Sequence, residues 1–269
     1  MAAAQVFVGA ALCSGQELGL LIDESESYSN QMLEYKQHTI YMAFVLVKRA
    51  MLILRHGFPG SPKRIRILME EAMDNKNAEE NCESAPTYPY YDMLTNFYCM
   101  WLEYLFGEYE LCWQTAQKNK DISRQSIGRF PFLCTHFFYS GLAALELAQK
   151  HFKTEYITAI NEAITQMKAW ATSTQWNCQH KLDLLNAELA HLKGDEAGAA
   201  ELYDVAIQAA GKHQFIHEEA LAFERAGNFY QGSGDRKKAS FCFRKAHDGY
   251  TKWGATGKAA QVQEKWGLV

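Results

Sequence analysis

Apolar residues in the C-terminal third of the chain recur every three or four positions. One such series is Leu182, Leu185, Leu189 and Leu192, and similar series begin at Ala199 and after residue 238. This is the period of helices that bury one face, and nothing nearby alternates with the period of two that a half-buried strand requires. The pattern predicts a row of amphipathic helices in this part of the chain.

The same reading extends upstream and gives an all-α chain. It predicts helices at about 28–54, 63–80, 88–106, 109–119, 131–149 and 153–172, with five more after residue 177. Four of the five prolines fall between residues 59 and 89, so 56–62 and 81–89 are the expected long loops between helices. We therefore expect residues 1–269 to form one helical domain of about 10–12 helices.

An internal repeat supports this architecture. The segment "LKGDEAGAAELYDVAIQAA" (192–210) aligns with "GSGDRKKASFCFRKAHDGY" (232–250) at an offset of 40 residues, and "YLFGEYELCWQTAQK" (104–118) is a weaker copy. Periods of this length indicate helix pairs that stack on one another to bury a shared face. Residues 177–260 hold the best-defined repeats, and the sequence predicts an α-solenoid of antiparallel helix pairs.

The stretch "FYQGSGDRKKASFCF" (229–243) has two interpretations. A glycine-rich turn before three cations resembles a phosphate-binding loop, but such a loop follows a strand and has a different glycine spacing. Here the preceding residues have a helical period, and the copy at Gly194 lacks the cations. We interpret Gly194 and Gly234 as left-handed residues that end a helix, with Asp195 and Asp235 as the N-caps of the next one.

Composition narrows the function classes. The net charge of −4 and a pI near 6.1 argue against a nucleic-acid partner. Seven cysteines, odd in number and without a C-x-x-C pair, argue against a disulfide framework or a zinc site and fit a reducing compartment. The longest apolar stretch, residues 40–54, contains Lys48 and Arg49 and is too short to span a membrane. A cytoplasmic protein without a membrane span is expected.

The residues that resemble catalytic or metal sites lack the partners such sites need. "FIHEEALAFE" has His217 but leucine where a second zinc-binding histidine would stand, so His217 is interpreted as a helix-start residue. His136 is expected to be packed among aromatic residues, and Ser140 lacks a glycine-flanked turn and a base. Trp253 is expected to pack in the core, with Gly254 ending its helix. We predict no enzyme activity, no cofactor and no metal.

Several segments together resemble one family. "YLFGEYELC", "FYSGLAALEL", "HKLDLLNAELAHLKGDEAGAAELYDVAIQAA", "FIHEEALAFERAGNFY" and "FRKAHDGYTKWGATGKAAQV" resemble the tetratricopeptide-like region of predicted-ATPase, multi-sensor serine/threonine/histidine kinases. The resemblance covers about residues 17–265. It implies a tetratricopeptide-like right-handed superhelix that connects an ATPase to a sensor. The family's catalytic parts have no counterpart here, because the chain has no P-loop, kinase lysine or H-R-D set.

These observations favour a non-catalytic protein–protein interaction scaffold or connector in signal transduction, whose partner is a protein, a peptide or a neighbouring kinase or ATPase domain. An alternative comes from "RAGNFYQGSGD", which resembles repeats that clamp the acidic C-terminal peptides of heat-shock chaperones. In that hypothesis a chaperone-associated adaptor binds the peptide through Asn228, Lys237, Arg244 and Lys245. A third hypothesis, a small enzyme with an unrecognised site, has no residues to support it.

Overall fold

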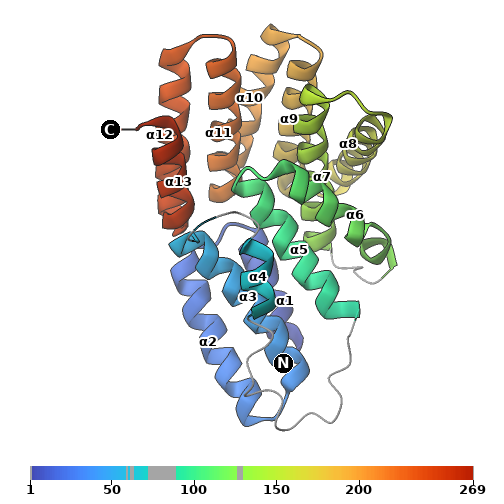
Figure 1. Cartoon of the computed structure of the whole chain (residues 1–269), viewed down its shortest axis with the longest axis vertical. Coiled ribbons are helices and arrows are strands. Elements are labelled where there is room, and N and C mark those ends of the chain that lie inside the picture. Colours follow the sequence, from blue (N-terminus) through green and yellow to red (C-terminus); the bar gives the residue numbers. More distant parts are fainter. Residues whose placement is uncertain (1, 59, 61–63, 72–88, 126–129, 269) are drawn as a thin grey trace.

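The computed structural model describes residues 2–58, 60, 64–71, 89–125 and 130–268, and these residues form helices with no strand among them (Figure 1). The described part contains thirteen helices, more than the ten to twelve expected. Each helix packs on its neighbours in the chain, as in a solenoid of helical repeats. The predicted all-α class is confirmed.

The N-terminal region contains three helices: α1 (Ala2–Cys13), α2 (Leu18–Glu34) and α3 (His38–His56). The prediction of a single helix over 28–54 is wrong, because the chain reverses at residues 35–37. Lys36 takes the left-handed conformation with φ 53°. The amide of Gln37 donates to the Met32 carbonyl at 2.8 Å, which closes the end of α2. Neither glycine nor proline marks this turn, so residue type gave no signal for it.

The middle of the chain contains α4 (Arg64–Glu71), α5 (Pro89–Leu105), α6 (Tyr109–Gln125), α7 (Phe130–Lys150) and α8 (Thr154–Ser173). These match the predicted helices within a few residues, except that α6 extends further and that 72–80 of the predicted 63–80 lie outside the described residues. Of the predicted loops, 81–88 also lie outside the described residues. The 56–62 loop begins as predicted where α3 ends, and its residues 59, 61 and 62 are likewise outside.

The C-terminal region contains α9 (Gln175–Leu192), α10 (Glu196–Lys212), α11 (Ile216–Gly232), α12 (Arg236–Trp253) and α13 (Thr256–Trp266). Gly194 and Gly234 have φ values of 78° and 85°, as the repeat predicted. Asp195 and Asp235 are the N-caps that follow them, and each carboxylate accepts the backbone N–H three residues on. The repeated sequence therefore encodes a repeated turn.

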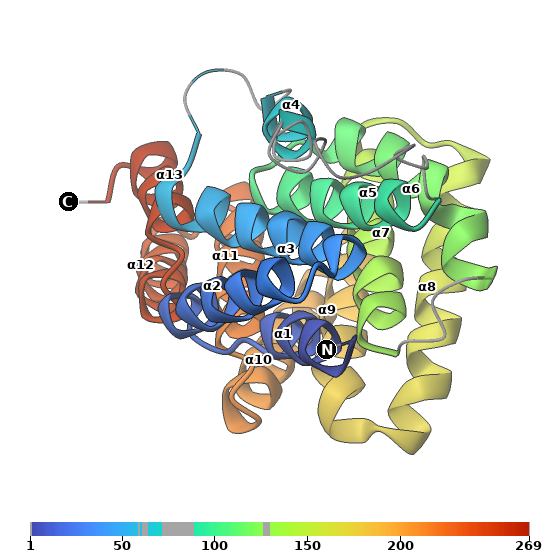
Figure 2. The ribbon, with the colours of Figure 1, turned by 90° about the horizontal axis from the view of Figure 1, so that it is seen from below.

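The two ends of the chain meet. Helix α13 packs on α3, and the Thr256 hydroxyl donates to the Arg55 carbonyl. The indole N–H of Trp253 donates to the Gln16 carbonyl at 3.1 Å. Helices α1–α3 therefore lie across one end of the array formed by α5–α13, which Figures 1 and 2 show from two directions. This closure was not foreseen from the repeat alone.

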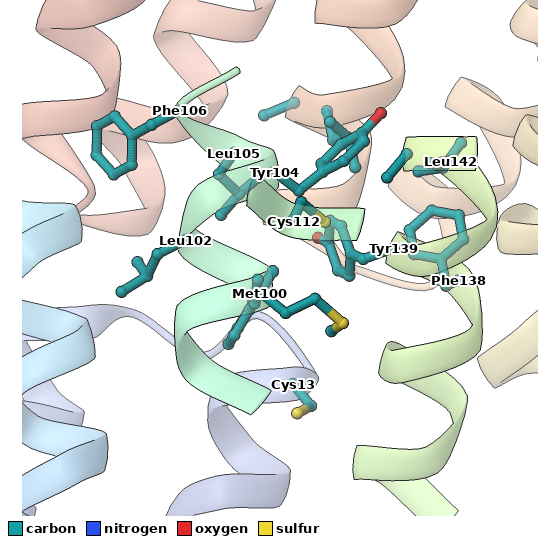
Figure 3. Packing of buried hydrophobic residues seen from close by; sticks show 14 of the residues in the cluster. Cys13, Met100, Leu102, Tyr104, Leu105, Phe106, Cys112, Phe138, Tyr139 and Leu142 are labelled. Atoms are coloured by element: carbon teal, nitrogen blue, oxygen red, sulfur yellow. The ribbon is translucent and has the colours of Figure 1, made fainter. Parts of the chain in front are cut away.

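Helix α5 carries the centre of the core. The Trp101 ring lies 5.9 Å from that of Tyr139 on α7, 6.1 Å from that of His217 on α11 and 6.2 Å from that of Trp253 on α12. Figure 3 shows side chains of α5, α7 and the end of α1 sharing this interior. Trp101 of α5 and the turn at Gly15 both lie against His217 at the start of α11. Most residues of α11 are buried, whereas α10 and α12 each have an exposed face.

Candidate functional site

The turn at Gly234 determines which way the cationic residues 236–238 face. It ends α11 and starts α12 at Arg236, and all three cations lie exposed in the first turn of α12. A helix, rather than a strand, precedes the turn, and the Asp235 carboxylate already accepts the Lys238 amide at 3.1 Å. The interpretation of 229–243 as a turn between helices is confirmed.

The outer face of α12 is strongly basic. The helix holds six lysines and arginines and one aspartate, whereas the whole chain has a net charge of −4. Lys237, Arg244, Lys245 and Lys252 are exposed at spacings that place them on one side of the helix. Phe241 lies among them with half of its surface exposed, and the Lys245 ammonium is 5.8 Å from the centre of its ring. The exposed Asp248 lies on the same side of the helix, so the face combines an apolar side chain with an excess of positive charge.

A cleft of about 400 Å³ adjoins this face at the end of α13. Arg236, Arg244 and Lys265 contribute its charged groups, and the rings of Phe243 and Trp266, stacked at 4.1 Å, form an apolar wall. The remaining lining residues are Gln231, Ser240, Gly267 and Leu268. Within the described part of the chain no acidic side chain lines the cleft, so its charge is wholly positive.

The structure brings together three of the four residues predicted to bind a partner. Lys237, Arg244 and Lys245 share the exposed face of α12, and Arg244 also lines the cleft, where its Nη1 donates to the Ser240 hydroxyl at 3.1 Å. Asn228 is half-buried on α11 and does not line the cleft.

Sequence reasoning missed Arg236, Phe241, Lys265 and Trp266. The spacing of four between residues 236, 240 and 244 could have indicated one row on a helix. No local signal could have joined Lys265 to that row, because the fold of α13 back along α12 brings it there.

A buried ionic cluster connects α9 with α11. The ammonium of Lys181 lies 2.7 Å from a carboxylate oxygen of Glu218 and donates to the Asn177 carbonyl at 2.9 Å, and His180 also hydrogen-bonds to Glu218. Burial by itself would raise the pKa of Glu218, but Lys181 and the two neighbouring histidines hold that pKa well below its usual range. The carboxylate is therefore ionised and fully engaged in pairing.

Two further clusters connect other helices. Arg225 on α11 holds Glu188 on α9 through two bonds of 2.8 and 3.0 Å, and it also pairs with Glu146 on α7. Lys258 on α13 donates to Glu224 on α11 at 2.9 Å. These acids and bases lie between helices and pair with one another, so they join successive repeats. None of them lines the cleft beside α12.

The other residues considered from the sequence serve packing. His217 is the second residue of α11 and is buried, and burial lowers its pKa to about 4, so the ring is neutral at pH 7. His136 is also buried, with a pKa of about 4 for the same reason. The Ser140 hydroxyl donates to the Phe137 carbonyl of its own helix. Trp253 lies in the core, and Gly254 ends α12, as predicted.

Among the residues that the structure describes, no three histidine, cysteine or acidic side chains are grouped so that they could hold a metal ion. None of the described helices is long and apolar enough to cross a lipid bilayer.

In comparisons with known proteins, no protein-family model matches the chain and no curated protein matches it. The resemblance to the repeat region of multi-sensor kinases therefore stays a prediction from the quoted segments.

Proposed function

We propose that this chain is a non-catalytic protein-interaction scaffold that binds an acidic segment of a partner protein on the outer face of α12. One observation carries the proposal: Phe241 is half exposed at the centre of a face built from Lys237, Arg244, Lys245 and Lys252. Protein interfaces concentrate their binding energy in aromatic and arginine side chains, and complementary charge steers the partner to them.

The adjoining cleft supports an acidic ligand. A guanidinium group binds a carboxylate through two parallel hydrogen bonds, and the cleft offers two arginines and a lysine without an acidic neighbour in its described lining. The stacked rings of Phe243 and Trp266 provide an apolar wall for the side chain next to such a carboxylate. The expected ligand is thus an acidic peptide segment that also carries an apolar residue.

The experiment measures binding of a fluorescent acidic peptide that ends in a free carboxylate. The triple variant Lys237→Glu, Arg244→Glu and Lys245→Glu should bind at least about tenfold more weakly, because it reverses the charge of the face. The matched control reverses three exposed lysines elsewhere, with Lys168→Glu, Lys193→Glu and Lys212→Glu, and carries the same net charge. The proposal would be contradicted if both triple variants lost the same amount of peptide affinity. It would also be contradicted if the wild type bound a single-stranded RNA of equal charge more tightly than the peptide.

We also propose that the scaffold acts as a connector in a signalling protein that contains ATPase or sensor kinase domains. The quoted segments support this, and stacked repeats provide a continuous path of contacts along which domains can be coupled. An antibody against residues 181–253 tests it on the native gene product. A band several times larger than 30.6 kDa supports the connector, and a band near that mass contradicts it and favours a separate adaptor.

The chaperone-associated adaptor is the second candidate, because the cationic side chains of the cleft are of the kind that binds the C-terminal carboxylate such an adaptor requires. Peptides with a free and an amidated C-terminus separate it from general acidic binding. The adaptor predicts that Arg244→Ala and Asn228→Ala weaken only the free-carboxylate peptide. If Asn228→Ala binds the free-carboxylate peptide as tightly as the wild type, the chaperone-associated adaptor is contradicted.

A further inference from the structure

Three sulfur atoms meet between α7, α8 and α9. The sulfur of Cys134 lies 3.7 Å from that of Cys178 and 3.8 Å from that of Met167. Both cysteines are free thiols and are almost completely buried. They lie 44 positions apart in the sequence, so the packing of α7 against α9 places them in contact.

A cavity gives access to one thiol of this pair, that of Cys134. It has a volume of about 80 Å³, and Cys134 lines it together with Cys13, Thr135 and Lys181. A larger cleft of about 490 Å³ between the α1–α2 turn and the α10–α11 turn shares Ser14, Asn177 and Phe215 with it. A water molecule occupies roughly 30 Å³ in the liquid, so the inner cavity has room for a molecule the size of a small peroxide.

The two thiols have different surroundings. Cys178 can accept hydrogen bonds from the Cys134 thiol and from the Thr174 hydroxyl at 3.5 Å, and the buried Lys181 ammonium adds positive charge. The hydrogen bond from Cys134, with those from Thr174 and the charge of Lys181, lowers the pKa of Cys178 to about 7. The same bond raises the pKa of Cys134, and burial raises the pKa of Cys13 to about 12.

We propose that Cys134 and Cys178 form an oxidisable dithiol that reacts with small hydroperoxides and closes to a disulfide between α7 and α9. The Cys134 thiol passes its proton to the Cys178 thiolate, to which it is hydrogen-bonded, and the Cys134 thiolate, which lines the cavity, attacks a peroxide oxygen. The O–O bond breaks, and the departing oxygen takes up a proton to leave as an alcohol or as water. The Cys178 thiol then attacks the sulfenic sulfur, the S–O bond breaks, and water leaves with the proton of Cys178. The two thiols lose two electrons and the peroxide gains them.

Closure needs a small movement. The sulfurs must approach from 3.7 Å to about 2.05 Å, the length of a disulfide bond. The bond would join helices of two successive repeats that already pack together. An added dithiol reductant would reopen it, since the exchange is reversible.

The test exposes the full-length protein to hydrogen peroxide and follows its intact mass and peptide map. We expect the loss of two hydrogen atoms and a cross-linked peptide containing Cys134 and Cys178, both reversed by a dithiol. The matched control Cys242→Ala, which alters a buried thiol on α12, should react like the wild type.

Two further variants assign the roles. Cys178→Ala removes the resolving thiol, so a sulfenic acid on Cys134 should persist and be trapped by a 1,3-diketone. Cys134→Ala should form neither the disulfide nor the adduct. Circular dichroism confirms that each variant is folded. A disulfide that involves Cys13, a trapped adduct on another cysteine, or a wild-type mass unchanged by peroxide would overturn the proposal.

Discussion

Gly194 and Lys36 occupy the same left-handed region of backbone conformation, although only one of them is a glycine. An L-residue in this region has its Cβ close to a backbone oxygen, which costs about 1–2 kcal/mol that glycine does not lose. Both residues end a helix, and in both the next amide closes the turn with a hydrogen bond to a carbonyl five residues back. The hydrogen bonds of the turn therefore outweigh the strain at Lys36.

Replacing Lys36 with glycine should stabilise the protein. We expect the free energy of unfolding to rise by up to about 1 kcal/mol, because the relief of strain exceeds the added entropy of the unfolded chain. Gly194→Ala is the reverse experiment: a Cβ there meets no atom within 4 Å, so its expected loss of about 1 kcal/mol comes from the backbone alone. Urea denaturation measures both, and a loss of stability in Lys36→Gly would contradict the argument.

The buried His136 should make stability depend on pH. Its folded pKa is about 4 because burial disfavours the charged ring, whereas an unfolded histidine titrates near pH 6.5. Between these values the unfolded chain binds the extra proton, so this contribution to stability is complete above about pH 6.5 and is lost as the pH falls toward 4. When the pH falls from 7 to 5, the free energy of unfolding of His136→Phe should therefore decrease by about 2 kcal/mol less than that of the wild type. Identical losses in the two proteins would refute this account.

At the scale of the helices, the C-terminal repeats are joined by a capped turn. Asp195 and Asp235 begin α10 and α12 with the same backbone geometry, and their carboxylates accept amides at 2.9 and 3.1 Å. By contrast, α9 and α11 begin without a side-chain cap. Every second helix of the region thus receives a cap directly from the repeated sequence. The helices then pack closely, since a Cβ at Gly249 would lie 2.8 Å from the Cβ of Ala220.

Removing the N-cap of α10 or that of α12 should destabilise the protein by a similar free energy. Asp195→Ala and Asp235→Ala should each lower the free energy of unfolding by about 1 kcal/mol, because an amide at the helix start loses its acceptor. Asp235→Asn keeps an acceptor oxygen and should stay within a few tenths of a kcal/mol of the wild type. Thermal denaturation by circular dichroism compares the variants. A cost as large for Asn as for Ala would show that charge, rather than the cap, stabilises the turn.

For the whole molecule, the decisive feature is the contact between the chain's two halves. An open array of repeats has only neighbour contacts, so its ends fray separately. Here α13 packs on α3, and Gln261 on α13 donates to the Phe106 carbonyl at the end of α5 at 3.1 Å. Gly257 allows this contact, since a Cβ at that position would lie only 2.0 Å from the backbone nitrogen of Gly57.

Gly257→Ala should therefore separate α13 from α3. Backbone atoms cannot move aside as a flexible side chain can, and overpacking of this kind costs about 1–3 kcal/mol. Hydrogen exchange should show lost protection in α13 and at the end of α3 together. Gly232→Ala on α11 is the matched control, because a Cβ there meets nothing within 4 Å and alanine favours the helix. Exchange confined to α13 alone would contradict the coupling of the two ends.

Local signals in the sequence were sufficient for most of the helices and for the turns at Gly194 and Gly234, because helical periodicity, glycine and N-cap aspartate act within a few residues. They also grouped Lys237, Arg244 and Lys245 with Asn228, and the structure places the three cations, but not Asn228, on one exposed helix face. They failed at residues 35–37, where no residue type marks the turn.

Three features depend on contacts between segments that are distant in the sequence. They are the closure of α13 on α3, the contact of Cys134 with Cys178 and the addition of Lys265 to the cleft. Such contacts form because packing the whole chain together removes apolar surface from water. The area buried depends on segments far apart in the sequence, so no short stretch of residues predicts it.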